Sequence, residues 1–120
     1  MTVSQNPGTD MFRAADALDV DGWVGYLAPG VRFRFGNTDP LTGRKAVRQA
    51  VAEFFTTISG LKHTILREWR ADDMIIQKLD VTYTRHDGKT VTIPAVNLLR
   101  VGAGLIADYQ IYVDLAPVYA

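Results

Sequence analysis

The sequence predicts a small α+β domain in which a curved antiparallel sheet, shaped like a cone or half-barrel, is covered by N-terminal helices around an apolar pocket. Helical patterns occupy the first half of the chain and strand patterns the second half, an order that favours α+β over alternating α/β folds. The chain has 120 residues, of which 48% are hydrophobic, and this is enough for one domain with its own core.

The N-terminal segment, residues 1–9, is polar and contains a Pro7-Gly8 break. It lacks the basic region followed by an apolar region that marks a signal peptide. We therefore expect a short flexible arm on a cytoplasmic protein. Residues 10–120 contain no linker, repeat or low-complexity stretch, so they are expected to form a single domain.

Two short helices are expected after the arm. Thr9 or Asp10 is suited to cap a helix that ends near Leu18, because both side chains accept hydrogen bonds from the first helical N–H groups. Asp19 is suited in the same way to cap a second helix over 20–27. A proline-glycine pair follows this helix and predicts its end.

The third helix shows the clearest pattern. Over 47–58, apolar residues recur at i, i+3, i+4, i+7, i+8 and i+11, which gives the single stripe of an amphipathic helix. Thr42 is its expected cap. Alternating patterns bounded by glycine-rich turns predict strands over 31–35, 63–69, 74–85, 90–101 and 105–115.

Composition excludes several classes of function. The 13 basic and 13 acidic side chains cancel, so no large field attracts nucleic acid or anionic lipid. No apolar run approaches the ~20 residues that cross a bilayer. Cysteine is absent, which excludes disulfides and thiol nucleophiles. The two histidines have no second ligand at metal-binding spacing, so no metal is expected.

The order of elements resembles the nuclear transport factor 2-like superfamily, and most of all its SnoaL-like (polyketide cyclase-like) branch. The segments that carry the resemblance are 33–40 (FRFGNTDP), 43–47 (GRKAV) and 105–114 (LIADYQIYVD). The resemblance covers about 10–115 and implies a cystatin-like fold with a hydrophobic pocket. It also implies a small apolar ligand with one or two oxygens, no cofactor, and a homodimer formed through the outer sheet face. One scaffold hosts many functions, so the chemistry has to be compared residue by residue.

Partial similarity to limonene-epoxide hydrolase implies a set of catalytic residues. The Arg-x-Asp strand motif of that family reads Lys78-Leu79-Asp80 here, and its Tyr-x-Asn pair reads Phe35-Gly36-Asn37. The resemblance thus implies Asp80 as a base, with Asn37 and Lys78 as polarising donors. Ile111 stands where that family has its second aspartate, so the acid of epoxide hydrolysis is missing.

The ketosteroid isomerase pattern does not fit, because its base falls near Phe35 and its tyrosine near Met11.

The role of Asp80 depends on which face of strand 74–85 points inward. The resemblance implies that the polar face of this strand, with Lys78 and Asp80, points into the pocket. Hydrophobic periodicity alone favours the opposite orientation. The other face would then be exposed and apolar, with Leu79, Val81, Tyr83 and Tyr112, and would form the homodimer interface.

The remaining pocket positions combine aromatic, aliphatic and polar side chains. His63 is either an acid–base group or a structural strand residue. Asn97 either bonds a neighbouring residue or reaches the pocket. The expected ligand-binding residues are Trp23, Phe35, His63, Ile93, Ala95, Asn97, Tyr109 and Ile111.

Two classes of function remain open at this point. The first is a cofactor-free isomerase, cyclase or hydrolase that acts on a small apolar oxygenated molecule. The second is a non-catalytic ligand-binding module, or a dimeric interaction domain, with the same fold.

Overall fold

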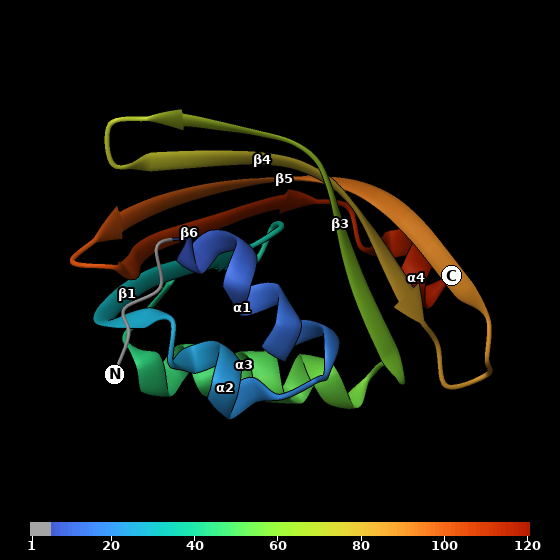
Figure 1. Ribbon diagram of the computed structural model, residues 1–120. Coiled ribbons are helices and arrows are strands. Elements are labelled where there is room, and N and C mark those ends of the chain that lie inside the picture. The colour runs from blue at the N-terminus through green and yellow to red at the C-terminus, as the bar shows by residue number, and fades with distance from the viewer. Residues whose placement is uncertain (1–5) are drawn as a thin grey trace.

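The computed structural model describes residues 6–120, which form an open, mixed six-stranded sheet with helices on its concave side (Figure 1). The strand order is β2-β1-β6-β5-β4-β3. The strands are β1 (Leu27–Phe35), β2 (Leu41–Thr42), β3 (Gly60–Ala71), β4 (Met74–Thr84), β5 (Thr90–Gly102) and β6 (Leu105–Val113). The helices are α1 (Pro7–Asp16), α2 (Val20–Val24), α3 (Arg44–Thr56) and α4 (Ala116–Tyr119).

The expected α+β class is confirmed, with one difference in the sheet. Strands β3 to β6 form the predicted antiparallel meander. Strand β1 lies parallel to β6, with Phe33 opposite Tyr109, so the sheet is mixed. In Figure 1 the long strands bend over α1, α2 and α3, and α4 lies beneath the far ends of β4 and β5.

Helix α1 begins earlier than the sequence suggested. Asn6 caps it, since its side-chain oxygen accepts a hydrogen bond from the Thr9 N–H at 3.2 Å. Pro7 fits the first turn because a proline there gives up no helical hydrogen bond. Pro7 and Gly8 are buried, so an arm over 1–9 is wrong for residues 7–9. Residues 1–5 of that arm lie outside the described part of the chain.

The predicted N-cap is correct for α2 and wrong for α3. Asp19 caps α2 by accepting a hydrogen bond from the Gly22 N–H at 3.0 Å, as predicted. Thr42 belongs to β2 and does not cap α3. Gly43 occupies the N-cap position of α3 with φ 94°, a backbone conformation that residues with a Cβ rarely adopt. The short helix α4 was not predicted.

Strand β4 turns its apolar face inward. Leu79, Val81 and Tyr83 are between 1% and 3% exposed and contribute to the core, so the prediction that they form an outer surface is wrong. Lys78 and Asp80 point to the opposite, convex face. This orientation is favoured because burying large apolar side chains removes more apolar surface from water than burying a lysine and an aspartate. Tyr112 is 54% exposed on the outer face, as expected.

A bulge interrupts β3 at Leu66. Before it, His63 pairs with Val81 across β4; after it, Glu68 pairs with Gln77. Both of these β4 residues are buried. The extra residue shifts the alternation by one position, so that His63 and Glu68 share the inner face although they lie five positions apart, an odd offset. Among helices within residues 6–120, none is long and apolar enough to cross a membrane.

Candidate functional site

A cavity of about 50 Å³ lies between the helices and the inner sheet face. A single water needs ~10–15 Å³ by the same measure, so there is room for a small organic group. Most of the wall is aromatic or aliphatic. The lining residues are Ala15, Trp23, Phe33, Phe35, Val51, Phe54, Phe55, Leu61, His63, Leu79, Val81, Tyr83, Ala95, Asn97, Tyr109 and Ile111.

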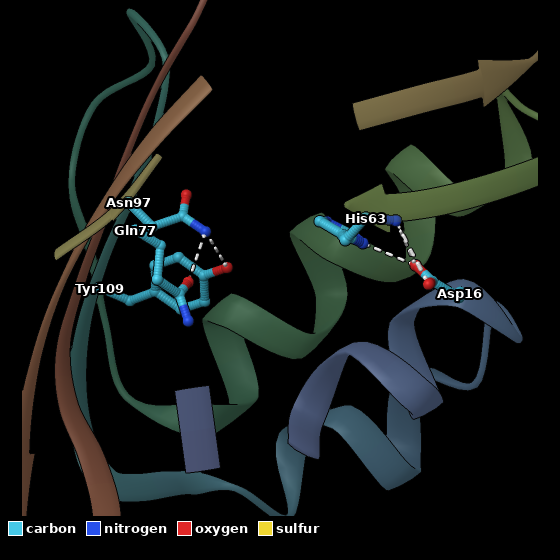
Figure 2. Close-up of polar contacts among 5 residues, drawn as sticks. All are labelled: Asp16, His63, Gln77, Asn97 and Tyr109. Atoms are coloured by element: carbon cyan, nitrogen blue, oxygen red, sulfur yellow. Dashed lines mark hydrogen bonds and ion pairs between the residues drawn. The ribbon is translucent and has the colours of Figure 1, made fainter. Parts of the chain in front are cut away.

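One polar residue in the wall, His63, is paired with the carboxylate of Asp16. His63 Nδ1 lies 2.6 Å from Asp16 Oδ1, and the His63 backbone N–H also donates to the Asp16 carboxylate at 3.2 Å (Figure 2). Asp16 is at the end of α1 and His63 is on β3. The His63 side chain is 13% exposed. The pair therefore joins the first helix to the sheet at the edge of the cavity.

The carboxylate determines where the imidazole carries its proton. An ionised Asp16 can only accept hydrogen bonds, so the proton of a neutral His63 must be on Nδ1. The other ring nitrogen, Nε2, is then an acceptor with a free lone pair. No side chain or backbone group among residues 6–120 forms a hydrogen bond with Nε2. This nitrogen is therefore available to a molecule in the cavity.

Aromatic contacts hold this arrangement in place. Phe12 stacks on the His63 ring with a centroid distance of 4.1 Å and an interplanar angle of 7°. At the other end of the cavity, Phe33 contacts Tyr109 at 5.4 Å and Trp23 at 5.7 Å, both edge to face. Such contacts between aromatic rings restrict rotamers and stabilise the wall.

A second polar group lies away from His63, on β4, β5 and β6 (Figure 2). Asn97 Nδ2 donates to Gln77 Oε1 at 3.2 Å and to the Tyr109 hydroxyl oxygen at 3.5 Å. Burial raises the pKa of Tyr109 and that of Tyr83 well above the ordinary tyrosine range. Both hydroxyls keep their protons at neutral pH. The cavity thus has a basic nitrogen at one end and neutral hydrogen-bonding groups at the other.

The residues that the sequence proposed as catalytic do not line this cavity. Lys78 and Asp80 lie on the convex face of β4, in a separate groove with Tyr112. Asn37 is exposed in the loop after β1, beside Asp114. Asp80 as a base in the pocket, with Asn37 and Lys78 as donors, is therefore not compatible with this geometry.

Apart from Ile93, every residue expected to bind ligand is in the cavity wall. Ile93 is a buried core residue on β5. Asp16 and Gln77 were not predicted from the sequence. Gln77 carried a signal, since it is the one polar residue among the alternate apolar positions of 75–83. Asp16 carried a weaker one, because it follows the buried Phe12 by one helical turn.

No group of three or more histidine, cysteine or acidic side chains within residues 6–120 is arranged to hold a metal ion.

Comparison with known proteins identifies the scaffold. The family model described as a SnoaL-like domain matches residues 9–109. None of the curated proteins matches the chain.

Solved structures share the fold at low sequence identity. A protein with a ketosteroid isomerase-like fold from Catenulispora acidiphila, in complex with trimethylamine, has a TM-score of 0.84 at 18% identity, over 94% of this chain and 88% of that one. A candidate SnoaL-like polyketide cyclase from Jannaschia sp. has a TM-score of 0.76 at 17% identity, with coverage of 99% and 92%. An epoxide hydrolase from M. tuberculosis that resembles limonene-epoxide hydrolase has a TM-score of 0.79 at 12% identity, with coverage of 95% and 84%.

Proposed function

Because the chain belongs to the SnoaL-like domain family, we propose that it is a cofactor-free acid–base enzyme acting on a small, mainly apolar carbonyl compound. The observation that carries this proposal is His63, which lines an apolar cavity and is held by the Asp16 carboxylate. A histidine whose Nδ1 is held by a carboxylate is a common general base, since the second nitrogen is oriented towards the reacting group.

The proposed step is a proton transfer from the carbon next to a carbonyl group. His63 Nε2 takes the proton, and the electron pair of the C–H bond forms the double bond of an enolate. The resulting imidazolium is stabilised by the Asp16 carboxylate at 2.6 Å. Return of the proton to another carbon gives isomerisation. Attack of the enolate on a second carbonyl gives cyclisation: the π pair of that carbonyl becomes an alkoxide, which takes the proton back from the imidazolium. Hydrolysis would use the same nitrogen to activate a water.

The polar groups away from His63 suit the other half of this step. The enolate oxygen gains negative charge, and hydrogen-bond donors at that oxygen lower the barrier. Tyr109 is protonated at neutral pH and is buried in the cavity wall. A ligand that reaches from His63 to Tyr109 would present its reacting carbon to one end and its oxygen to the other.

The proposal is tested by deuterium exchange at the α-carbons of small cyclic ketones such as cyclopentanone, followed by proton NMR in D₂O. We expect the protein to accelerate loss of the α-proton signal over buffer. Shifts of cavity resonances without acceleration would favour the non-catalytic binding module instead. The absence of both binding and exchange, for every small ketone tested, would contradict the proposal.

We also propose that two copies associate through the convex face of the sheet. Leu66, Trp69, Val96 and Tyr112 are between 37% and 54% exposed there and, with Lys78 and Asp80, line a groove of about 400 Å³. Exposed apolar groups gathered on one face favour an interface. Lys78 and Asp80 carry opposite charges, so a two-fold axis can bring Lys78 of one copy against Asp80 of the other. The face is thus complementary to itself.

Substitution Tyr112→Asp is expected to weaken such a dimer by at least about 30-fold, the effect of losing a central aromatic contact. Tyr119→Asp is the matched control, because Tyr119 is 55% exposed, against 54% for Tyr112, but lies on α4 away from the face. Light scattering after size exclusion, over a range of concentrations, measures both. A wild-type chain that stays monomeric at high concentration would rule the dimer out.

A further inference from the structure

Two polar side chains are fully enclosed on the inner face of the sheet. Gln77 on β4 is 0% exposed and Asn97 on β5 is 2% exposed, and the two residues are paired directly across the strands. Buried amides are tolerated when their donors and acceptors find partners. The partners of this pair determine which end of each amide faces which neighbour.

The orientation of Gln77 follows from the backbone of α1. Gln77 Nε2 lies 3.0 Å from the Gly8 carbonyl oxygen and 3.0 Å from Glu68 Oε1 (Figure 2 shows the amide beside Asn97). A carbonyl oxygen has no proton to give, so the Gln77 NH₂ group must point at Gly8. The Gln77 oxygen is therefore the end that faces Asn97.

The orientation of Asn97 and Tyr109 follows from that of Gln77. Because Gln77 Oε1 only accepts, Asn97 turns its NH₂ group towards it and donates at 3.2 Å. The same NH₂ group donates to the Tyr109 oxygen at 3.5 Å. Tyr109 is thus an acceptor towards Asn97, and its own hydroxyl proton is not used in that contact. The Tyr109 hydroxyl donates no hydrogen bond to a group within residues 6–120, and Tyr109 lines the cavity.

We infer that Gln77 is a positioning residue: through Asn97 it makes the Tyr109 hydroxyl a hydrogen-bond donor to the cavity, so that the site selects ligands with a proton-free oxygen at that end. Ketones, enones, lactones and quinones have such an oxygen. The inference rests on the proposed function, because it requires that the cavity binds a small molecule. It adds the direction of the hydrogen bond and the residue that sets it.

The test compares two ligands of the same shape, cyclopentanone and methylenecyclopentane, which differ only in C=O against C=CH₂. Affinities are measured from chemical-shift titrations of the wild type, Tyr109→Phe and Gln77→Met. We expect the wild type to prefer the ketone by about 3- to 10-fold, the effect of one neutral hydrogen bond. Both variants should lose most of this preference and keep their affinity for the hydrocarbon.

The Gln77→Met result separates positioning from simple structural support. Without the Gln77 oxygen, Asn97 is free to turn its own oxygen towards Tyr109 and accept the hydroxyl proton, although Tyr109 itself is unchanged. A lost ketone preference with an unchanged hydrocarbon affinity supports the inference, since a general loosening of the cavity would weaken both ligands. A Gln77→Met protein that keeps the wild-type preference overturns it.

The wild type and Tyr109→Phe can still overturn the inference even if Gln77→Met does not fold. Equal affinity of the wild type for both ligands overturns the inference and leaves the proposed function standing. An unchanged preference in Tyr109→Phe overturns the assignment of Tyr109 as the donor. Failure of the wild type to bind either ligand overturns the inference together with the proposed function.

Discussion

Replacing His63 by glutamine is expected to slow α-proton exchange of a bound ketone about 100- to 10,000-fold, the usual contribution of a positioned general base. Glutamine keeps a similar length and polarity but has no basic nitrogen. The side chain is 13% exposed, so bulk buffer has little access to replace the lost base. Exchange rates measured by proton NMR at saturating ketone report the loss.

Asp16→Asn should give a comparable loss for a different reason. The asparagine NH₂ can donate to His63 Nδ1, which would move the imidazole proton to Nε2, the nitrogen that has to accept. The chain provides a matched control in His86→Gln, because His86 is exposed, lies outside the cavity wall, and has its Nε2 2.7 Å from the Thr56 carbonyl oxygen. His86→Gln should keep the wild-type rate. Equal rates in all three variants would show that neither His63 nor Asp16 takes part in the exchange.

Replacing Trp23 by alanine is expected to lower the free energy of unfolding by about 3–5 kcal/mol, as for other large buried aromatic residues. Trp23 is 4% exposed and its ring contacts Phe33 at 5.7 Å and Tyr109 at 6.2 Å. Truncation would enlarge the cavity and remove these contacts. Urea denaturation followed by circular dichroism measures the change.

Trp69→Ala is the corresponding control on the convex face. Trp69 is 40% exposed, and the Arg67 guanidinium lies 4.8 Å from its ring centroid. An exposed contact of this kind is worth about 0.5–1 kcal/mol, so the loss should stay in that range. The comparison needs a protein concentration at which the chain is monomeric, since Trp69 belongs to the proposed dimer face. Similar losses for both tryptophans would contradict the placement of Trp23 in the core.

The architecture was largely predictable because it depends on hydrophobic periodicity. The stripe of α3, the alternation of β4 and β5 and the glycine-rich turns specify elements of the right type in the right order. The errors are local. Pro7 looked like a break in an arm, but a proline is equally compatible with the first turn of a helix. The parallel pairing of β1 with β6 joins segments distant in sequence, which a local pattern does not encode.

The candidate site was less predictable for a physical reason. Similarity to an epoxide hydrolase directed attention to Asp80, whose own strand alternation places it on the convex face. The group that does meet His63 is Asp16, 47 positions earlier in the sequence. Their contact depends on how α1 packs against β3. A single polar residue at the edge of a helical apolar stripe does not predict which distant side chain it will contact. The orientation of Gln77 and Asn97 likewise follows from a backbone carbonyl on α1.

The bulge at Leu66 also limits which insertions and deletions strand β3 can tolerate. Between His63 and Glu68, deletion or insertion of one residue would move one of the two side chains to the convex face, because side chains alternate along a strand. The hairpin at 86–89 projects from the sheet as an exposed turn and carries no such constraint. Across relatives of this chain, the spacing within β3 is therefore expected to be preserved more strictly than its amino-acid identities, whereas the hairpin is free to vary in both.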